Sequence, residues 1–228
     1  MTNKSDIKTR KIRSFILRGG RLSKLQQHSI DTYYDTYCIP YNEKILDYKE
    51  SFCNGHPVII EIGFGMGITT AKIAHDFPEN NYLGIEVHRP GIGKLLSEIT
   101  RYGLENVRII EHDAVEVLET MIQDGSVDGF HIFFPDPWQK KRHHKRRLIQ
   151  DAFVDLLTRK LKQGGYLYSV TDWDSYAEQM LDVYTRQPLL HNTSEGFSKP
   201  ISWRPETRFE GKGIKKDHKI QELWVEKV

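Results

Sequence analysis

Cysteine is scarce in this sequence: Cys38 and Cys53 are the only two among 228 residues. They do not form a C-x-x-C pair, and no cluster of cysteine and histidine surrounds them, so we expect neither disulfides nor a metal site. Long hydrophobic runs are also missing, because no stretch approaches the roughly 18 apolar residues that a membrane helix needs. The apolar stretch in the basic N-terminal region is far too short for a signal peptide. These absences predict a soluble, cytoplasmic protein with no membrane or metal partner.

The net charge is small, at +2, but the charges are strongly segregated along the chain. Residues 1–30 contain eight Lys or Arg against one Asp, and residues 140–147 contain six Lys or Arg and no acid. The rest of the chain carries a net charge of −11. Separated basic and acidic regions are typical of proteins that bind a polyanion in one orientation. A solvated tail and a solvated loop would give the same pattern, so charge alone leaves both interpretations open.

The length of the chain and its alternating short apolar runs predict one large α/β domain. We expect residues 1–40 to form a basic arm that is partly mobile, and residues 41–228 to form the main domain. Segments of helical length separate the apolar runs, and the clearest is the amphipathic stretch 148–161. This alternation predicts a Rossmann-like, mostly parallel, doubly wound sheet with helices on both faces. Strands are expected at residues 57–63, 81–87, 107–113, 127–134 and 164–171, with a last strand of undetermined direction at 220–228.

A glycine-rich turn follows the first expected strand, in the sequence EIGFGMG. Glycines at a strand-to-helix turn let the backbone approach a bound ligand closely. The spacing is G-x-G-x-G, which differs from the G-x-G-x-x-G that is typical of dinucleotide sites. Tight turns also need glycine, so the turn by itself is a weak signal for a cofactor. The expected cofactor-binding glycines are Gly63, Gly65 and Gly67.

Acidic residues lie in or at the ends of the first three expected strands: Glu61, Glu86 and Asp113. Glu61 sits inside an apolar run, where an unpaired carboxylate would be costly. In open α/β sheets the ligand crevice lies at the carboxyl ends of the strands, so the three acids should line it. They favour a ligand with hydroxyl groups and positive charge over a polyphosphate, and S-adenosylmethionine fits this description. Taken singly, each acid is explained equally well by helix capping or solvation.

The fourth expected strand runs directly into Pro135, Asp136 and Pro137. Pro137 disfavours the α conformation at Asp136, and Pro135 has a fixed φ, so the carboxylate should be held rigidly beside the cofactor crevice. Rigid placement suits a catalytic group. Trp138 offers a flat surface on which a base could stack, although packing is the commoner role of such an aromatic. The cations that follow, at 140–147, should lead into the next helix, where they oppose the helix dipole unless a polyanion binds them.

Together these motifs resemble one family. EIGFGMG, GIEVH, FFPDPWQKKRHHKRR, VTDW and TRFEGKG closely match the bacterial-type tRNA (guanine-N7)-methyltransferases, and RGGRLSKLQQ is similar to that family's N-terminal segment. The resemblance covers nearly the whole chain. It implies a class I S-adenosylmethionine-dependent methyltransferase that acts on N7 of guanine 46, in the variable loop of tRNA.

The resemblance also implies roles for individual residues. Glu61, Glu86, Asp113 and Asp136 would contact the cofactor, and Asp136 would also be catalytic. Phe209 stands where we expect tyrosine in this family, which puts a hydroxyl contact at that position in doubt. The residues implied for substrate binding are Lys140, Arg142, Lys145, Arg146, Arg147, Asp172, Thr207, Arg208, Phe209 and Glu210.

Several alternatives stay open at this stage. Asp172 could equally be the N-cap of the helix that follows it. Exocyclic amino methyltransferases of DNA also carry a proline-flanked acid or amide, usually followed by two prolines and an aromatic, whereas this chain reads DPW. A non-catalytic RNA-binding module would retain the basic regions without chemistry. An NAD-dependent oxidoreductase is disfavoured by the glycine spacing. The sequence allows either a monomer or a homodimer.

Overall fold

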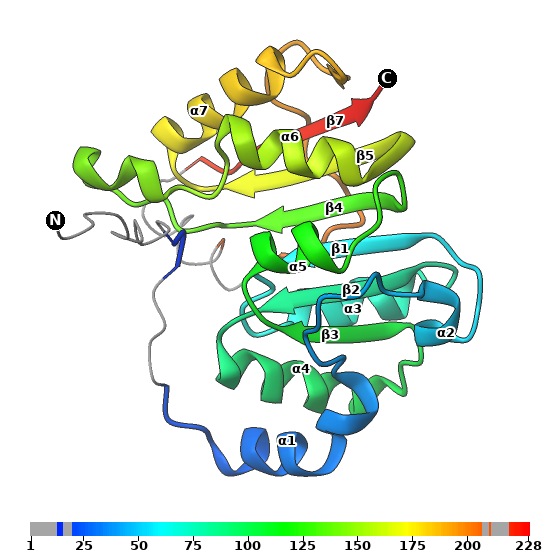
Figure 1. Cartoon of the computed structure of the whole chain (residues 1–228). Helices are drawn as coiled ribbons and strands as arrows, with labels where there is room; N and C mark the ends of the chain where they lie inside the picture. The colour runs from blue at the N-terminus through cyan, green and yellow to red at the C-terminus, as the bar shows by residue number, and fades with distance from the viewer. Residues whose placement is uncertain (1–12, 16–19, 207–209, 211–218) are drawn as a thin grey trace, which may run out of the picture.

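The computed structural model describes residues 13–15, 20–206, 210 and 219–228 (Figure 1). In this part of the chain the central feature is a seven-stranded sheet in the order β3-β2-β1-β4-β5-β7-β6. The strands are β1 (Val58–Ile62), β2 (Asn81–Glu86), β3 (Val107–Glu111), β4 (Val127–Phe133), β5 (Leu161–Thr171), β6 (Leu190–Asn192) and β7 (Gln221–Lys227). The helices are α1 (Lys24–Tyr37), α2 (Tyr48–Phe52), α3 (Ile68–Asp76), α4 (Arg89–Tyr102), α5 (Ala114–Thr120), the 3-10 helix η1 (Lys141–Arg146), α6 (Asp151–Lys160) and α7 (Asp174–Arg186).

Strands β1 to β5 run parallel, and β7 joins them antiparallel between β5 and β6. The structure therefore confirms the predicted doubly wound sheet and gives the direction of its last long strand. The strand order reverses between β1 and β4, and this is the position where open α/β sheets bind their ligands. The carboxyl ends of β1 and β4 lie side by side at that point.

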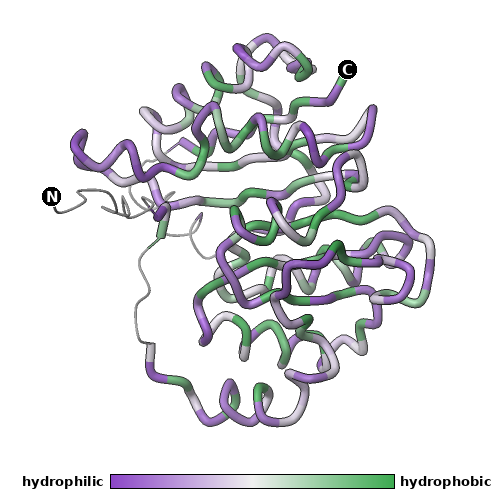
Figure 2. The backbone as a smooth tube through the Cα atoms, viewed as in Figure 1, coloured by the Kyte–Doolittle hydropathy of each residue, from purple (hydrophilic) through white to green (hydrophobic). Residues whose placement is uncertain are grey.

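Hydrophobic side chains cover both faces of the sheet because successive residues of a strand point to opposite sides. In β1, Ile60 and Ile62 pack into the cluster formed with α2, α5, α6 and α7, whereas Ile59 packs into the cluster formed with α1, α3 and α4. All five residues of β1 are buried. Figure 2 shows the hydrophobic residues concentrated along the central strands, while the segment between β4 and α6 is mostly hydrophilic.

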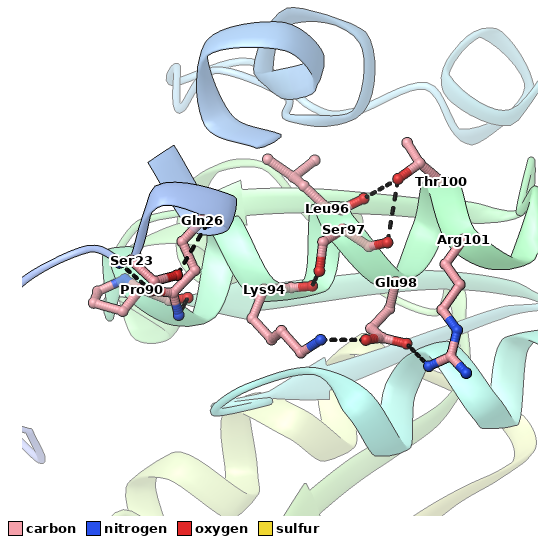
Figure 3. Close-up of polar contacts among 9 residues, drawn as sticks. All are labelled: Ser23, Gln26, Pro90, Lys94, Leu96, Ser97, Glu98, Thr100 and Arg101. Carbon is pink, nitrogen blue, oxygen red and sulfur yellow. Dashed lines mark hydrogen bonds and ion pairs between the residues drawn. The ribbon is translucent and has the colours of Figure 1, made fainter. Parts of the chain in front are cut away.

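Helix α1 is anchored against α4 at its N-terminus (Figure 3). A capping box closes this end, because Ser23 and Gln26 each accept a hydrogen bond from the other's backbone N–H. The Gln26 side chain also donates to the carbonyl of Pro90 at 2.9 Å. The two helices approach closely at Gly93, where an added Cβ would lie 2.7 Å from the Gln26 carbonyl oxygen. Part of the predicted basic arm is therefore a helix packed on the main domain, while the partial mobility of residues 1–40 stays a prediction.

Helix α6 begins at Asp151, three residues later than the periodicity predicts. The N–H of Ile149 donates to the Tyr176 hydroxyl at 3.0 Å, and Gln150 is an extended N-cap with φ −135°. The preceding cations consequently form η1 instead of the first turn of α6, and Asp151 occupies that turn. An acid at this end complements the helix dipole, so the predicted conflict between the basic run and the helix does not arise.

Candidate active site

A cavity opens at the carboxyl ends of β1, β2 and β4, where the strand order reverses. Residues that follow β3 complete its wall. Four of the predicted site residues line this cavity: Gly63, Glu86, Asp113 and Asp136. The fold therefore brings together residues from four separate parts of the sequence, as the strand-end pattern predicts.

The glycine loop after β1 adopts a backbone conformation that residues with side chains rarely adopt. Gly63, Gly65 and Gly67 have φ angles of 73°, 59° and 65°, in the left-handed region. The Gly63 N–H donates to the Ile85 carbonyl at 2.8 Å, which ties the loop to the end of β2. Gly67 is the N-cap of α3. Gly63 lines the cavity, and the other two glycines shape the turn that places it there.

The Glu86 carboxylate, at the end of β2, is fixed by three backbone N–H groups. Oε1 accepts from Val87 at 2.7 Å and from His88 at 3.0 Å, and Oε2 accepts from Gly65 at 2.9 Å. These bonds link β2 to the glycine loop and hold the carboxylate on the cavity wall. A carboxylate oxygen can accept two hydrogen bonds, so Oε2 retains the capacity to accept from a ligand hydroxyl.

Glu61 lies in β1 and is almost completely buried, with 3% of its surface exposed, so unlike the other two acids it does not line the cavity as expected. Its Oε2 atom has no hydrogen-bond partner among the described residues. Burial raises the pKa of this carboxyl to about 7, with the Thr70 hydroxyl opposing the shift and the charge of Glu86 adding to it. A buried acceptor of this kind would be stabilised by a donor or positive charge on a bound ligand.

The prediction that Asp113 ends the third strand is wrong, because β3 ends at Glu111. Asp113 is instead the N-cap of α5, and its Oδ1 accepts from the Val115 N–H at 2.9 Å. It still lines the cavity. Glu111 points elsewhere, since its Oε2 accepts from the Tyr34 hydroxyl at 2.9 Å and from Arg89 at 2.7 Å. Glu111, at the end of β3, therefore links α1 and α4, and Asp113, the N-cap of α5, faces the cavity.

Asp136 lies on an unusual turn after β4. It is exposed and lines the cavity together with Phe134 and Pro135. Phe134 and Trp138, two residues away on either side, have φ angles of 51° and 46°. Residues other than glycine rarely adopt this conformation, which costs of the order of 1–3 kcal/mol each and occurs mostly where the surrounding structure enforces it. The backbone of the turn is therefore constrained on both sides of the carboxylate.

The indole of Trp138 is already engaged within the protein. Its Nε1 donates to the Ser14 carbonyl at 2.9 Å, and the Arg146 guanidinium lies 3.9 Å from the centre of its ring. Arg146 also donates to the carbonyls of Arg13 and Phe15, each at 3.1 Å. A face of Trp138 that a base could have stacked on is thus covered by Arg146.

Ser14 and Phe15 line the cavity. The sequence did not predict this contribution from the N-terminal region. Their contacts with Trp138 and Arg146 join positions more than 120 residues apart. No local pattern in the sequence could have indicated such a contact. His112, which also lines the cavity, was missed as well. Its ring stacks on Tyr41 with 3.7 Å between the ring centres.

The basic run divides into exposed and buried cations. Lys140, Arg142 and Lys145 are exposed, and Arg146 is half-buried against Trp138. Arg147, which was expected to contact the substrate, is buried, with 3% of its surface exposed. The structure therefore separates the buried Arg147 from the exposed cations, which can present their charge to a polyanion.

Two other predicted substrate residues, Asp172 and Glu210, are not among the residues that line the cavity. Asp172 follows β5 and is half-buried. The N-cap of α7 is Trp173, so the alternative that Asp172 caps this helix is wrong. Glu210 is buried, and its two carboxylate oxygens accept from the Arg204 guanidinium at 2.8 Å and 2.5 Å. The three remaining residues of that set, Thr207, Arg208 and Phe209, lie outside the described residues.

No group of three or more His, Cys, Asp or Glu side chains in residues 13–15, 20–206, 210 and 219–228 is arranged to hold a metal ion. No helix in the same ranges is long and apolar enough to cross a membrane.

Comparison with known proteins identifies the relatives of this chain. Residues 55–223 match a protein family described as "Putative methyltransferase". A tRNA (guanine-N(7)-)-methyltransferase of Methylobacillus flagellatus is 52% identical, over 96% of this chain and 93% of that protein. Proteins of the same name from Neisseria meningitidis serogroup C and from Nitrosospira multiformis are 49% and 50% identical, over 96% and 94% of this chain and 92% and 93% of theirs.

Solved structures share the fold at much lower sequence identity. The 16S rRNA methyltransferase KamB superposes with a TM-score of 0.60 at 12% identity, covering 81% of this chain and 94% of that one. An S-adenosylmethionine-dependent O-methyltransferase from Thermotoga maritima gives a TM-score of 0.51 at 18% identity, covering 90% of this chain and 72% of that one. These two similarities concern the fold alone.

Replacing Glu61 by Gln should change how stability depends on pH. The pKa of Glu61 is raised from 4.5 to about 7 in the folded protein, so its contribution to stability is present at low pH and is lost as the pH rises through this range. Glutamine does not ionise. Between about pH 5 and pH 8, we expect the wild-type protein to lose about 1–3 kcal/mol of unfolding free energy relative to Glu61→Gln. Urea denaturation of both proteins without cofactor measures this, and a pH-independent difference would contradict the account.

Proposed function

The chain belongs to the tRNA (guanine-N7)-methyltransferase family, and from this premise we propose that it methylates guanine 46 in the variable loop of tRNA, with Asp136 holding the base. It is an enzyme that transfers the methyl group of S-adenosylmethionine to N7 of guanine in tRNA. The observation that carries the assignment of Asp136 is its position at the end of β4, on the wall of the cavity that also contains Gly63 and Glu86.

The residues of the cavity fit S-adenosylmethionine. When bound, this cofactor supplies an electrophilic methyl group on a positively charged sulfur. Glu86 Oε2 can accept from a ribose hydroxyl in addition to its bond from Gly65. Asp113 adds a further acid to the cavity wall. Glu61 lies outside the lining, and a donor on the cofactor that reached its Oε2 would give this buried oxygen a partner. Acids at these positions would repel the phosphates of a dinucleotide, whereas S-adenosylmethionine has none.

The chemistry requires orientation more than proton transfer. N7 of guanine carries a lone pair in the ring plane and no proton, so it can attack the methyl group without a general base. Positioning and electrostatics must therefore supply the rate. We assign to Asp136 the role of accepting hydrogen bonds from N1 and N2 of the guanine, which would also stabilise the positive charge that spreads into the purine. Asp172, after the neighbouring strand β5, is proposed to assist in holding the base.

The exposed cations suit the RNA backbone. Lys140, Arg142 and Lys145 lie beside the turn that carries Asp136, on the hydrophilic segment between β4 and α6 (Figure 2). A second cavity shares Ser14, Asp113 and Leu148 with the first. Its lining includes the cations Lys145, Arg146, Arg147 and Arg159 and the acids Glu116 and Glu119. Phosphate contacts along such a surface would position the RNA, while the cavity selects the base.

Nucleoside analysis of tRNA tests the function directly. Purified protein should convert unmodified tRNA, in the presence of S-adenosylmethionine, into tRNA that contains one 7-methylguanosine at position 46. Mass spectrometry of digested nucleosides identifies the modified base, and mapping of nuclease fragments identifies its position. A tRNA with adenine at position 46 is the matched control and should accept no methyl group. A product methylated on an exocyclic amino group would refute the assignment to N7.

Asp136→Asn should abolish most of the turnover while leaving the binding of tRNA nearly intact. The amide keeps the shape of the side chain but loses its charge, and half of its polar surface becomes a donor that faces the donors of guanine. Loss of one preorganised electrostatic contact typically lowers kcat by about 10²–10³-fold. Single-turnover methylation and a filter-binding assay measure the two quantities separately. Turnover equal to that of the wild type would eliminate Asp136 from the mechanism.

Removing two exposed cations should weaken binding in a salt-dependent way. For Arg142→Ala combined with Lys145→Ala, we expect a higher KM for tRNA and a salt slope reduced by about one unit per lost phosphate contact. Arg101→Ala combined with Lys162→Ala is the matched control, because it removes the same charge from exposed positions away from the cavity. The slope should not change in the control. Equal slopes for both double variants would show that the basic run does not contact RNA.

A further inference from the structure

Arg147 is the most completely hydrogen-bonded cation of the basic run. A guanidinium has five N–H donors, and here each one has an acceptor. Nε donates to the Pro137 carbonyl at 2.8 Å. Nη1 donates to the Ser175 carbonyl at 3.0 Å and to the Gln179 side chain at 2.8 Å. Nη2 donates to the Ser175 hydroxyl at 3.1 Å and to His144 at 3.2 Å.

The Arg147 side chain is also buried. Only 3% of the Arg147 surface is exposed, and its guanidinium lies 4.8 Å from the centre of the Tyr176 ring. Arg147 is among the residues that line the second cavity, but its guanidinium N–H groups are already engaged within the protein and are not free for a phosphate. Arg147 therefore acts within the protein, although it stands in the same run as the exposed cations.

Two of the acceptor residues of Arg147, Pro137 and Ser175, lie next to the acids proposed to hold the guanine. Pro137 is the residue directly after Asp136, on the turn that follows β4. Ser175 lies three residues after Asp172, in the first turn of α7, which follows β5. One planar group thus connects the carboxyl end of β4 to the beginning of α7.

The turn after β4 needs such an anchor. The last backbone bond that joins it to the sheet is from the Phe134 N–H to the Val170 carbonyl, at 2.8 Å. Pro135 and Pro137 have no N–H and cannot continue this pattern. The Pro137 carbonyl is held by Arg147, immediately beside the catalytic carboxylate.

We propose that Arg147 is a positioning residue for methyl transfer, which fixes the Asp136 turn relative to the Asp172 turn so that both carboxylates meet the same base. The proposal rests on the proposed function for the roles of these two acids. It reassigns Arg147 from binding RNA to orienting the site. Its loss should therefore lower kcat and leave the electrostatic component of tRNA binding unchanged.

The test uses Arg147→Lys, which keeps the positive charge but cannot bridge the two turns. A displacement of about 1 Å at a reacting group can cost about a hundredfold in rate, so we expect a fall of that order in kcat. The KM for tRNA and the slope of binding against salt should stay within about twofold of the wild type. Arg186→Lys is the matched control, because Arg186 links α7 to Asp151 of α6 at an exposed position. It should retain the wild-type kcat.

Chemical rescue distinguishes positioning from a general effect on stability. For Arg147→Ala, added guanidinium should restore part of the lost kcat, whereas sodium chloride at the same ionic strength should not. If Arg147→Lys does not fold, Ser175→Ala removes one acceptor and should give a several-fold fall in kcat at unchanged KM.

Two results would overturn the proposal. One is an Arg147→Lys enzyme with a lower melting temperature but wild-type kcat in its folded form, which would make the residue purely structural. The other is a wild-type kcat with a raised KM and a reduced salt slope, which would make it an RNA contact. The methylated atom in the wild-type product is identified separately. If the protein methylated an atom other than N7, the proposed function would fail, but the comparison of kcat between the wild type and Arg147→Lys would still test the role of Arg147.

Discussion

The site depends on one constraint, which is the fixed backbone of the turn after β4. Its prolines have no N–H for the sheet, and Phe134 and Trp138 are held in the left-handed region. Contacts from outside the turn compensate for this. Arg147 donates to the Pro137 carbonyl, and Trp138 Nε1 donates to the Ser14 carbonyl. The backbone is thereby constrained on both sides of the exposed Asp136 carboxylate, which stays accessible to a base.

The parallel sheet supplies the other half of the site. Strands β1, β2 and β4 end at the same edge, so groups far apart in the sequence meet there without a dedicated domain. The Glu86 carboxylate is stabilised by backbone N–H groups of Gly65, Val87 and His88, whereas Glu61 is buried, has an oxygen without a partner among the described residues, and has a raised pKa. Glu86 thus stabilises the glycine loop. The burial of Glu61 costs free energy until a ligand supplies a donor or a positive charge.

Much of this arrangement could be predicted from the sequence, because the signals are local. Alternating apolar runs predicted the order of strands and helices, and the constrained backbone beside Asp136 lies where its two prolines indicated a restricted turn. The errors and omissions arise at the boundary of an element or where contacts between distant positions decide. Asp113 looks like a strand-end acid but caps α5, and Arg147 looks like its exposed neighbours but is buried against α7. The contribution of Ser14 to the cavity has no local signal either. A run of cations has the same composition whether its members face water or the protein.

The most direct test is a crystal structure of the protein with S-adenosylhomocysteine and 7-methylguanosine monophosphate bound. The account predicts that the Asp136 carboxylate lies within hydrogen-bonding distance, roughly 2.6–3.2 Å, of N1 and N2 of the purine. The methyl group on N7 should then point towards the sulfur of the cofactor product. A structure with both ligands in place and the Asp136 side chain turned away into solvent would contradict the central claim.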